Sequence, residues 1–295
     1  MQIKKKIFTN KNILITGGTG SFGQHFIKTV LKDFAPKKVI IFSRDELKQY
    51  EMAEKLKKYK KKLRFFIGDI RDLPRLKTAM KDVDIVVHAA ALKQVETAEY
   101  NPFEVVKTNV MGTQNVIDAI YSSDVKIAIA LSTDKAAAPI NLYGATKLTA
   151  DKLFISANNY IPNKSFSVVR YGNVMMSRGS VIPSFEKQKI SGVINITDKD
   201  MTRFSLTLPE GVEFVIKCLS NMWGGELFVP KIPSYKILDL AKAVAPQCKI
   251  NFIGTRPGEK IHEDLVTNSD SLNTIEFKNY YIILSSTKNY EKTLI

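Results

Sequence analysis

One stretch of the sequence decides the fold: NILITGGTGSFG, residues 12–23. Its first five residues are mostly apolar and predict a buried strand, and the glycine-rich residues that follow open a helix. Glycines at 17, 20 and 23 permit a tight turn, close approach of the backbone to a pyrophosphate, and close packing of helix on strand. The amino end of that helix then faces the phosphate charge. The stretch therefore predicts a dinucleotide-binding βα unit with cofactor contacts from Gly17, Thr19, Gly20, Ser21, Phe22 and Gly23.

Apolar runs alternate with amphipathic segments through the first 175 residues. Strands are predicted at 12–16, 38–42, 63–67, 84–88, 127–132 and 166–171, and helices at 22–34, 45–59, 72–81, 103–122 and 143–158. Strands rich in Val, Ile and Leu that alternate with helices predict a parallel sheet covered on both faces. We therefore expect an α/β fold with a Rossmann-like doubly wound parallel sheet, in which residues 1–175 form the core of an NADP-binding domain. Prolines interrupt shorter elements afterwards, so residues 176–295 are expected to form mainly a smaller C-terminal substrate-binding region, with some segments returning to the Rossmann sheet.

The composition is that of a globular protein, since 44% of the 295 residues are hydrophobic and 25% are charged. No apolar run approaches the ~18–20 residues of a membrane span, so no membrane association is expected. The two cysteines, Cys218 and Cys248, stand apart from any pattern of Cys and His ligands, so no metal site is expected. Two lone thiols also indicate a reducing compartment, and we expect the protein to be cytoplasmic.

The net charge of +15 raises the question of nucleic-acid binding. The densest basic cluster, KKYKKK at residues 57–62, is predicted at the solvated end of a helix just before a strand. We therefore expect no nucleic-acid partner. A surface that binds phosphate-bearing small molecules fits the same charge.

The end of the second predicted strand indicates which dinucleotide binds. Chains that bind NAD usually place a carboxylate there to hold the ribose 2′-hydroxyl, whereas Ser43 and Arg44 occupy the position here. Arginine favours a 2′-phosphate, so NADP is predicted. Asp45 and Glu46 follow directly and leave NAD open.

Further cofactor contacts are predicted at the carboxyl ends of the next strands. Asp69 offers a carboxylate to the adenine amine, with Ile70 as an apolar neighbour, and small residues after the fourth strand let the dinucleotide lie against the backbone. His88 is expected to be a packed strand residue and not a catalyst. The remaining predicted cofactor contacts are Lys48, Ala89, Ala90, Ala91, Lys93 and Asn109.

A catalytic pair is predicted near the middle of the chain. Tyr143 and Lys147 are four residues apart and share one face of a helix. A lysine in that place lowers the pKa of the phenol by its positive charge, and the tyrosine then takes a proton from a substrate hydroxyl while a hydride leaves its carbon. The run STDK, residues 132–135, lies just upstream and adds an acid and an amine.

These residues together resemble the extended short-chain dehydrogenase/reductase family of nucleotide-sugar enzymes, from about Asn12 to Glu263 and more weakly to Tyr281. Within it the chain resembles the soluble UDP-N-acetylglucosamine 4,6-dehydratases that also invert C5. Segments that carry the closer match are SRDELKQ (43–49), AEYNP (98–102), LSTDKA (131–136), NLYGATK (141–147), RYGNV (170–174), SRGSVIP (177–183), MTRF (201–204), PKIPS (230–234) and GEKIHE (258–263).

Asp134 and Lys135 select the branch of the family. Retaining dTDP-glucose-type dehydratases carry Asp-Glu at these positions, and 4-epimerases lack the acid/base pair. Membrane-anchored dehydratases share Asp-Lys but typically have methionine in place of Tyr143. The chain departs from the pattern at Met176, where Gly or Ala is common, and at Glu96, where Pro is common; Ala137-Ala138 also replaces a Cys-Asn or similar pair.

The resemblance implies a mechanism with five catalytic residues: Thr133, Asp134, Lys135, Tyr143 and Lys147. NADP⁺ takes a hydride from C4 of the sugar while Tyr143 takes the proton of the 4-hydroxyl, and Lys147 holds the nicotinamide ribose. Thr133 hydrogen-bonds the 4-oxygen, Lys135 removes the C5 proton, and Asp134 protonates the departing 6-hydroxyl. Hydride then returns to C6, so NADP stays tightly bound and is recycled in each turnover.

The resemblance also implies the partners. The substrate is UDP-N-acetylglucosamine, with Asn173 and Arg178 at the diphosphate or uridine, Arg256 and Glu259 at the uridine phosphate and ribose, and Lys93 and Arg203 as weaker candidates. Helices at 103–122 and 143–158 carry apolar residues on more than one face, which favours a homo-oligomer, a dimer or higher. Two other enzyme activities remain open, a retaining 4,6-dehydratase and a 4-epimerase, and so does a non-catalytic NADP-binding scaffold.

Overall fold

The computed structural model describes residues 1, 3–4, 6–175 and 180–286, and its largest feature is a nine-stranded sheet. The strand order is β13-β14-β10-β6-β5-β4-β1-β2-β3. From β10 across to β3 in this order, all neighbouring strands pair in parallel. At the other side of β10, β14 and β13 add two antiparallel strands that form the edge of the sheet. The strands are β1 (Asn12–Thr16), β2 (Lys38–Ser43), β3 (Leu63–Ile67), β4 (Ile85–His88), β5 (Ile127–Thr133), β6 (Ser165–Tyr171), β10 (Leu227–Pro230), β13 (Thr274–Glu276) and β14 (Tyr280–Ile283). The order from β3 to β6 is 3-2-1-4-5-6, which confirms the predicted Rossmann-like doubly wound sheet.

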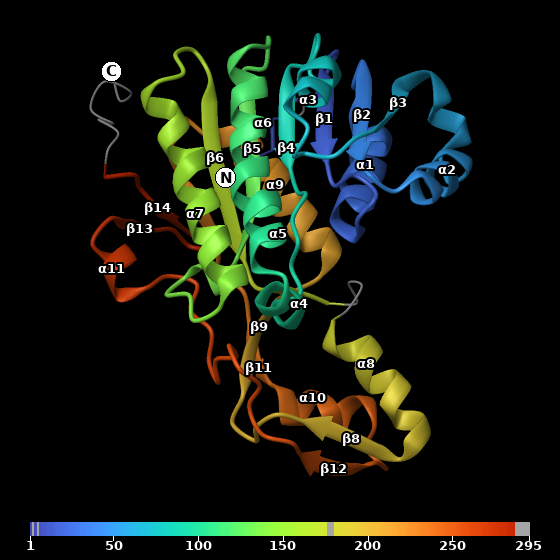
Figure 1. Cartoon of the computed structure of the whole chain (residues 1–295), viewed down its shortest axis with the longest axis vertical. Coiled ribbons are helices and arrows are strands. Elements are labelled where there is room, and N and C mark those ends of the chain that lie inside the picture. The colour runs from blue at the N-terminus through green and yellow to red at the C-terminus, as the bar shows by residue number, and fades with distance from the viewer. Residues whose placement is uncertain (2, 5, 176–179, 287–295) are drawn as a thin grey trace.

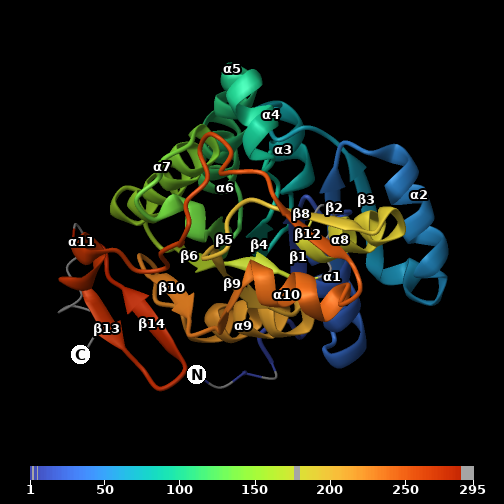
Figure 2. The same cartoon turned by 90° about the horizontal axis from the view of Figure 1, so that it is seen from below.

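Helices cover both faces of the sheet, as Figures 1 and 2 show. One face packs against α3 (Leu73–Ala79), α6 (Gly112–Tyr121) and α7 (Leu142–Ser156), through a core that includes Leu76, Ile117 and Phe154. The other packs against α1 (Ser21–Asp33), α2 (Glu46–Lys55) and α9 (Leu208–Asn221), through a core that includes Phe26, Met52 and Val215. The strands are therefore buried on both sides, which explains their near-continuous apolar sequence.

The helix predicted at 103–122 is present but is not uniform. It consists of α5 (Pro102–Val106), a π-helical turn η2 (Lys107–Met111) and α6, and a short helix α4 (Val95–Tyr100) precedes it. A π turn inserts a residue into the helical register, which apolar periodicity alone does not reveal. The basic cluster at 57–62 forms a short 3₁₀ helix, η1 (Lys57–Lys62), between α2 and β3.

A smaller lobe follows the carboxyl end of β6 and lies below the sheet in Figure 1. It contains a three-stranded sheet of β7 (Asn173–Val174), β9 (Thr202–Leu206) and β11 (Ser234–Lys236), and a pair of β8 (Val193–Ile196) with β12 (Lys249–Phe252). Helices α8 (Val181–Gln188) and α10 (Ile237–Val244) pack on the pair around Phe185 and Ile194. The remaining elements are η3 (Asp134–Ala136), η4 (Ala157–Asn159), η5 (Lys189–Ser191) and α11 (Asn268–Ser271).

Segments after residue 175 also return to the large sheet, because α9 packs on one face and β10, β14 and β13 extend its edge. Within the described part of the chain, no helix combines the length and the apolarity needed to cross a bilayer.

Candidate active site

A cavity of about 1700 Å³ lies between the carboxyl ends of the parallel strands and the smaller lobe. Ligands in doubly wound folds bind at this edge of the sheet, where the strand order reverses. Almost all of the predicted site residues line the cavity. They are Gly17, Thr19, Gly20, Ser21, Phe22, Gly23, Ser43, Arg44, Lys48, Asp69, Ile70, Ala89, Ala90, Ala91, Lys93, Thr133, Lys135, Tyr143, Lys147, Asn173, Arg203, Arg256 and Glu259.

The glycine-rich turn brings backbone to the cavity wall. Gly17 has φ +67°, and a Cβ there would lie 2.9 Å from the backbone nitrogen of Ala90. The Thr16 hydroxyl accepts hydrogen bonds from the backbone N–H groups of Ala89 and Ala90, both at 3.2 Å. The ends of β1 and β4 are thus tied together beneath a surface that carries no bulky side chain, as the close approach of a pyrophosphate requires.

His88 is a structural residue, as the sequence predicts. Its side chain is buried between Thr16, 2.8 Å from Nδ1, and Thr113, 3.0 Å from Nε2. Burial, with the charge of Lys147 adding to it, lowers the pKa of His88 to about 3, so the ring is neutral at physiological pH.

The end of β2 carries cations on the cavity wall. Asp45 caps α2 by accepting a hydrogen bond from the Lys48 backbone, at 3.0 Å, and its carboxylate also pairs with the Lys48 amine. The Asp45 carboxylate is therefore already engaged, while Arg44 lies 3.5 Å from Asp69 and keeps about half of its side chain exposed. Although partial burial raises the pKa of Asp69, hydrogen bonds and charge from Arg71, with the charge of Arg44, bring it below its ordinary value.

One further polar group points to a ligand in this cavity. The Thr108 hydroxyl lies in the π turn, lines the cavity, is buried, and makes no hydrogen bond within the described residues. A buried hydroxyl without a partner is costly, and a bound ligand would satisfy it. Together with the glycine cradle, this residue makes the site fit a dinucleotide.

Tyr143 and Lys147 lie on the first turns of α7, as predicted. The helix begins at Leu142, and Asn141 caps it by accepting a hydrogen bond from the Gly144 backbone at 2.7 Å. The amine of Lys147 donates to the carbonyl of Leu131 at 2.8 Å. Both side chains are buried, and burial lowers the pKa of Lys147 against the opposing charge of Asp151.

The pKa of Tyr143 differs from the sequence expectation. Burial raises it above its ordinary value, a hydrogen bond with Thr133 lowers it in part, and the charges of Asp134 and Asp151 raise it further. In the chain by itself, desolvation of a phenolate thus outweighs the other effects on the Tyr143 pKa, and the lowering by Lys147 stays a prediction.

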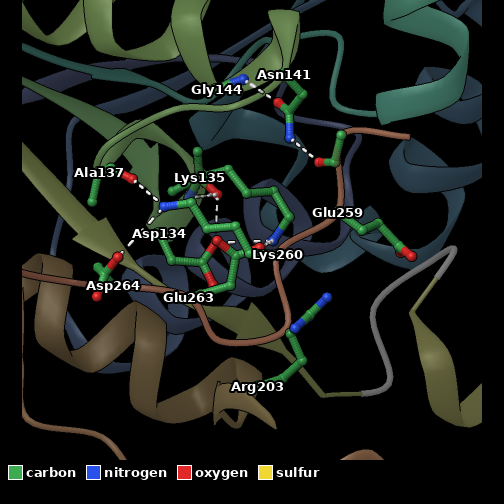
Figure 3. A network of polar contacts seen from close by, with 12 residues as sticks. Asp134, Lys135, Ala137, Asn141, Gly144, Arg203, Glu259, Lys260, Glu263 and Asp264 are labelled. Carbon is green, nitrogen blue, oxygen red and sulfur yellow. Dashed lines mark hydrogen bonds and ion pairs between the residues drawn. The ribbon is translucent and has the colours of Figure 1, made fainter. Parts of the chain in front are cut away.

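Lys135 stands between two buried carboxylates. Its amine lies 3.1 Å from Oδ1 of Asp134 and 3.2 Å from Oε1 of Glu263, and the two acidic side chains are 1% and 3% exposed. The Thr133 hydroxyl donates to the same Oδ1 of Asp134 at 3.0 Å. Thr133 and Lys135 thus present a hydroxyl and an amine to the cavity, with Asp134 behind them and Glu263 on the cavity wall beside Lys135. Figure 3 shows Lys135 with these two acidic side chains.

Of the predicted residues that the structure describes, Asp134 and Asn109 do not line the cavity. Asp134 lies behind Thr133 and Lys135, because the turn of η3 directs it into the protein. Asn109 is buried in the π turn, where its amide exchanges hydrogen bonds with the backbone of Leu92 at 2.8 and 2.9 Å. Asn109 thus supports the loop after β4, and its predicted contact with a cofactor stays a prediction.

The substrate candidates come from both parts of the chain. Arg256 pairs with Glu259 at 2.7 Å and with Glu96 at 2.9 Å. Glu96, which departs from the family pattern, therefore contacts a residue that is predicted to bind the substrate. Arg203 donates to the carbonyls of Thr202 and Ile261. Arg178, predicted at the diphosphate or uridine, and Met176 lie outside the described residues.

Among the cavity-lining residues that were not predicted as site residues, Glu263 and Thr108 bear on the chemistry. Glu263 is, with Asp134, one of the two carboxylates that pair with Lys135. Thr108 has a buried hydroxyl without a hydrogen-bond partner among the described residues. Glu263 belongs to the GEKIHE segment that carries the resemblance, which is the signal that would have found it. Thr108 carries no such signal, because only the π turn brings it to the cavity.

A Rossmann-like sheet whose strand ends share one cavity with a Tyr-Lys helix and a Thr-Asp-Lys turn defines an extended short-chain dehydrogenase/reductase. Within this class the chain belongs to the family described as polysaccharide biosynthesis protein, whose family model matches residues 13–285.

Relatives and solved structures agree with this assignment. The chain is 56% identical over 290 residues to the UDP-N-acetylglucosamine 4,6-dehydratase (inverting) of Campylobacter jejuni subsp. jejuni serotype O:2, across 97% of this chain and 86% of that one. It is 45% identical over 289 residues to the UDP-glucose 4-epimerase of Rickettsia bellii, across 94% and 84%. The structure of Pen from Bacillus thuringiensis superposes with a TM-score of 0.92 and 42% identity, covering 95% of this chain and 91% of that one. DesIV, a dTDP-glucose 4,6-dehydratase from Streptomyces venezuelae, shares the fold with a TM-score of 0.76 at 19% identity, covering 88% and 90%.

Proposed function

We propose that this protein is a UDP-N-acetylglucosamine 4,6-dehydratase that inverts C5. The observation that carries the proposal is the cavity wall on which Thr133, Lys135 and Tyr143 stand together. The 56% identical relative of that name supports it. An amine at position 135 is what separates this wall from a redox-only site, because oxidation and reduction at C4 need no second base.

Oxidation at C4 is the first proposed step. Tyr143 takes the proton of the 4-hydroxyl, and Thr133, its hydrogen-bonded neighbour, holds the 4-oxygen. A bound nicotinamide supplies a hydride acceptor for C4 and later a hydride donor for C6. Lys147 holds the cofactor ribose, a role supported by the position of its amine on the cavity wall beside the end of β5.

Loss of water follows from the 4-ketone, which acidifies the proton on C5. Lys135 removes that proton in its neutral form, because an ammonium cannot act as a base. Asp134 supplies the acid for the departing 6-hydroxyl. Since Asp134 stands behind the wall, its protonated form passes the proton to the Thr133 oxygen, which lies 3.0 Å from Oδ1, while Thr133 gives its own proton to the departing hydroxyl; before this step the Thr133 hydroxyl donates to Asp134. Protonation of C5 from the opposite face completes the inversion.

We infer that the cofactor is NADP, tightly bound and recycled. At the end of β2 the Asp45 carboxylate is engaged with Lys48, which leaves Arg44 to face a 2′-phosphate. Gly17 through Gly23 receive the pyrophosphate, and Asp69, Ile70 and the loop 89–91 line the adenine side. For the UDP-sugar we propose Asn173, Arg178, Arg203, Arg256 and Glu259, with Lys93 between the two ligands.

The cofactor proposal predicts that Arg44→Ala narrows the preference for NADP over NAD. A charge-assisted hydrogen bond is worth on the order of 1.5–3 kcal/mol, so the affinity for NADP should fall at least tenfold while that for NAD changes little. Titration calorimetry on cofactor-free protein measures both affinities. Arg64→Ala is a matched control, because Arg64 is exposed on β3 and does not line the cavity. Equal affinities for both dinucleotides in the unaltered protein would contradict the proposal.

The function is tested by incubating the protein with UDP-N-acetylglucosamine in deuterium oxide and following the product by NMR. We expect a 4-keto-6-deoxy sugar with inverted C5 and deuterium at that carbon. A product that keeps the D-gluco configuration at C5 would show a retaining dehydratase. A C4 epimer without loss of water would show an epimerase, and no reaction would favour the non-catalytic scaffold.

A further inference from the structure

The segment 256–264 crosses residues 135–141, which run from η3 to the start of α7, and contacts them at three points (Figure 3). Asn141 donates a hydrogen bond to the carbonyl of Gly258 at 2.7 Å, and Lys260 donates to the carbonyl of Ala137 at 2.9 Å. Glu263 makes the third contact, to the amine of Lys135 at 3.2 Å. The segment therefore brings one carboxylate to the reacting amine.

Glu263 is placed unlike an ordinary buried ion-pair partner. Its side chain is 3% exposed, it lines the cavity, and its second oxygen, Oε2, is buried without a hydrogen-bond partner among the described residues. A buried carboxylate with an unsatisfied oxygen is costly, so it is not explained by a gain in stability. Such groups gather where a site needs them for its chemistry.

Each of the two carboxylates beside Lys135 has one buried oxygen, Oδ2 of Asp134 and Oε2 of Glu263, without a hydrogen-bond partner among the described residues. The two differ in what the other oxygen binds and in whether they line the cavity. Oδ1 of Asp134 accepts from both the Thr133 hydroxyl and the Lys135 amine. Among the described residues, the Lys135 amine is the one polar partner of Oε1 of Glu263, and of the two carboxylates it is Glu263 that lines the cavity. Glu263 is therefore the carboxylate whose one evident partner is the amine and which stands where the reaction takes place.

We infer that Glu263 is a positioning residue and proton acceptor for Lys135 in the C5 step, an inference that rests on the proposed function. Glu263 takes one proton from the resting Lys135 ammonium, which leaves a neutral amine with its lone pair at the cavity wall. The amine then takes the C5 proton, and the C–H electron pair passes into the enolate of the 4-ketone. After the amine has released a proton to the sugar or to solvent, Glu263 returns its own, so both groups end as they began.

The test compares Glu263→Gln and Glu263→Asp with the unaltered protein in deuterium oxide. Two signals are followed in a single turnover: the transient absorbance of reduced nicotinamide, which reports oxidation at C4, and deuterium uptake at C5. Removal of a general acid/base group typically costs ~10²–10⁴-fold, so Glu263→Gln should lose C5 exchange by that factor and keep C4 oxidation within a few-fold.

The two variants separate chemistry from shape. Glutamine matches glutamate in size but cannot take the proton, whereas aspartate keeps the carboxylate and loses one methylene. If Glu263 acts through its basicity, Glu263→Asp retains more C5 exchange than Glu263→Gln. If Glu263 only fills space, the ranking reverses, and that result would overturn the inference; the C5 exchange of each variant is divided by its own C4 oxidation, so that a poorly folded variant does not change the ranking.

Asp264→Asn is the matched control. It removes the neighbouring charge in the same segment, where Asp264 is exposed and pairs with Lys260 at 3.5 Å. We expect rates within a few-fold of the unaltered protein. Failure of the unaltered protein to dehydrate UDP-N-acetylglucosamine would overturn the proposed function together with this inference. Normal product from the unaltered protein, with equal C5 exchange in Glu263→Gln, would overturn the inference alone.

Discussion

Tyr143 is buried, and burial disfavours the phenolate that its proposed role as a proton acceptor requires. Burial raises the pKa of its hydroxyl, and the nearby charges of Asp134 and Asp151 act in the same direction. The amine of Lys147, one helical turn away, donates to the Leu131 carbonyl. The spacing of Tyr143 and Lys147 predicts that both reach the same wall, which the structure bears out. The spacing does not predict the hydrogen-bond partners of the two side chains, because Leu131 and Thr133 belong to β5, a separate element, nor does it predict how deeply the side chains are buried.

Tyr143→Phe should keep the fold and the cofactor but lose most of the turnover. Phenylalanine fills the same buried space, so the melting temperature should stay close to that of the unaltered protein. The 4-hydroxyl loses its proton acceptor, which typically costs ~10²–10⁴-fold in rate. Steady-state kinetics with UDP-N-acetylglucosamine measures the loss, and near-normal turnover would remove Tyr143 from the mechanism.

At the scale of elements, the start of α7 packs directly against η3, the short helix that carries Asp134 and Lys135. A Cβ on Gly144 would lie 2.1 Å from the carbonyl oxygen of Lys135, so only glycine allows α7 and η3 to approach this closely. The sequence predicts the helix, and Asn141 with Gly144 belongs to the segment that carries the resemblance. The contact of Asn141 with Gly258, 117 residues further on, could not be predicted, because local patterns carry no information on which distant loops meet. The pairing of Lys135 with Glu263 could not be predicted either, because these residues are also far apart in the sequence.

Asn141 joins two functions that substitution can separate. Asn141→Ala removes the helix cap and should cost about 1 kcal/mol of stability, visible as a lower melting temperature. Asn141→Asp keeps an acceptor for the cap, and a negative charge suits the helix amino end. It loses the hydrogen bond to Gly258, however, so the segment with Arg256 and Glu259 should loosen and KM for the UDP-sugar should rise. An unchanged KM in Asn141→Asp would show that this hydrogen bond does not hold the segment.

At the scale of the whole molecule, the strand order explains how much of the site could be predicted. The residues that follow β1, β2 and β4 meet at one edge because parallel strands share a direction, so the motifs predict which residues line this side of the cavity. The smaller lobe is built from short elements around Phe185 and Ile194, and its β7, β9 and β11 come from separate parts of the chain. No local period specifies such a sheet, and the sequence therefore predicts a region there without its architecture.

The outer face of the α5–α6 segment leads to the last prediction, that the protein forms a symmetric oligomer. Phe103, Met111 and Tyr121 lie along this segment and are 61%, 53% and 63% exposed, an arrangement that favours contact with a second copy. We expect light scattering at micromolar concentration to give at least the mass of a dimer. Met111→Glu should weaken the association, since burying an unpaired carboxylate at an apolar contact is costly. Ile190→Glu is the control, because Ile190 is 89% exposed in the smaller lobe, away from this face, and its substitution should leave the mass unchanged. A monomer in the unaltered protein, or equal effects of the two substitutions, would contradict an interface at these helices.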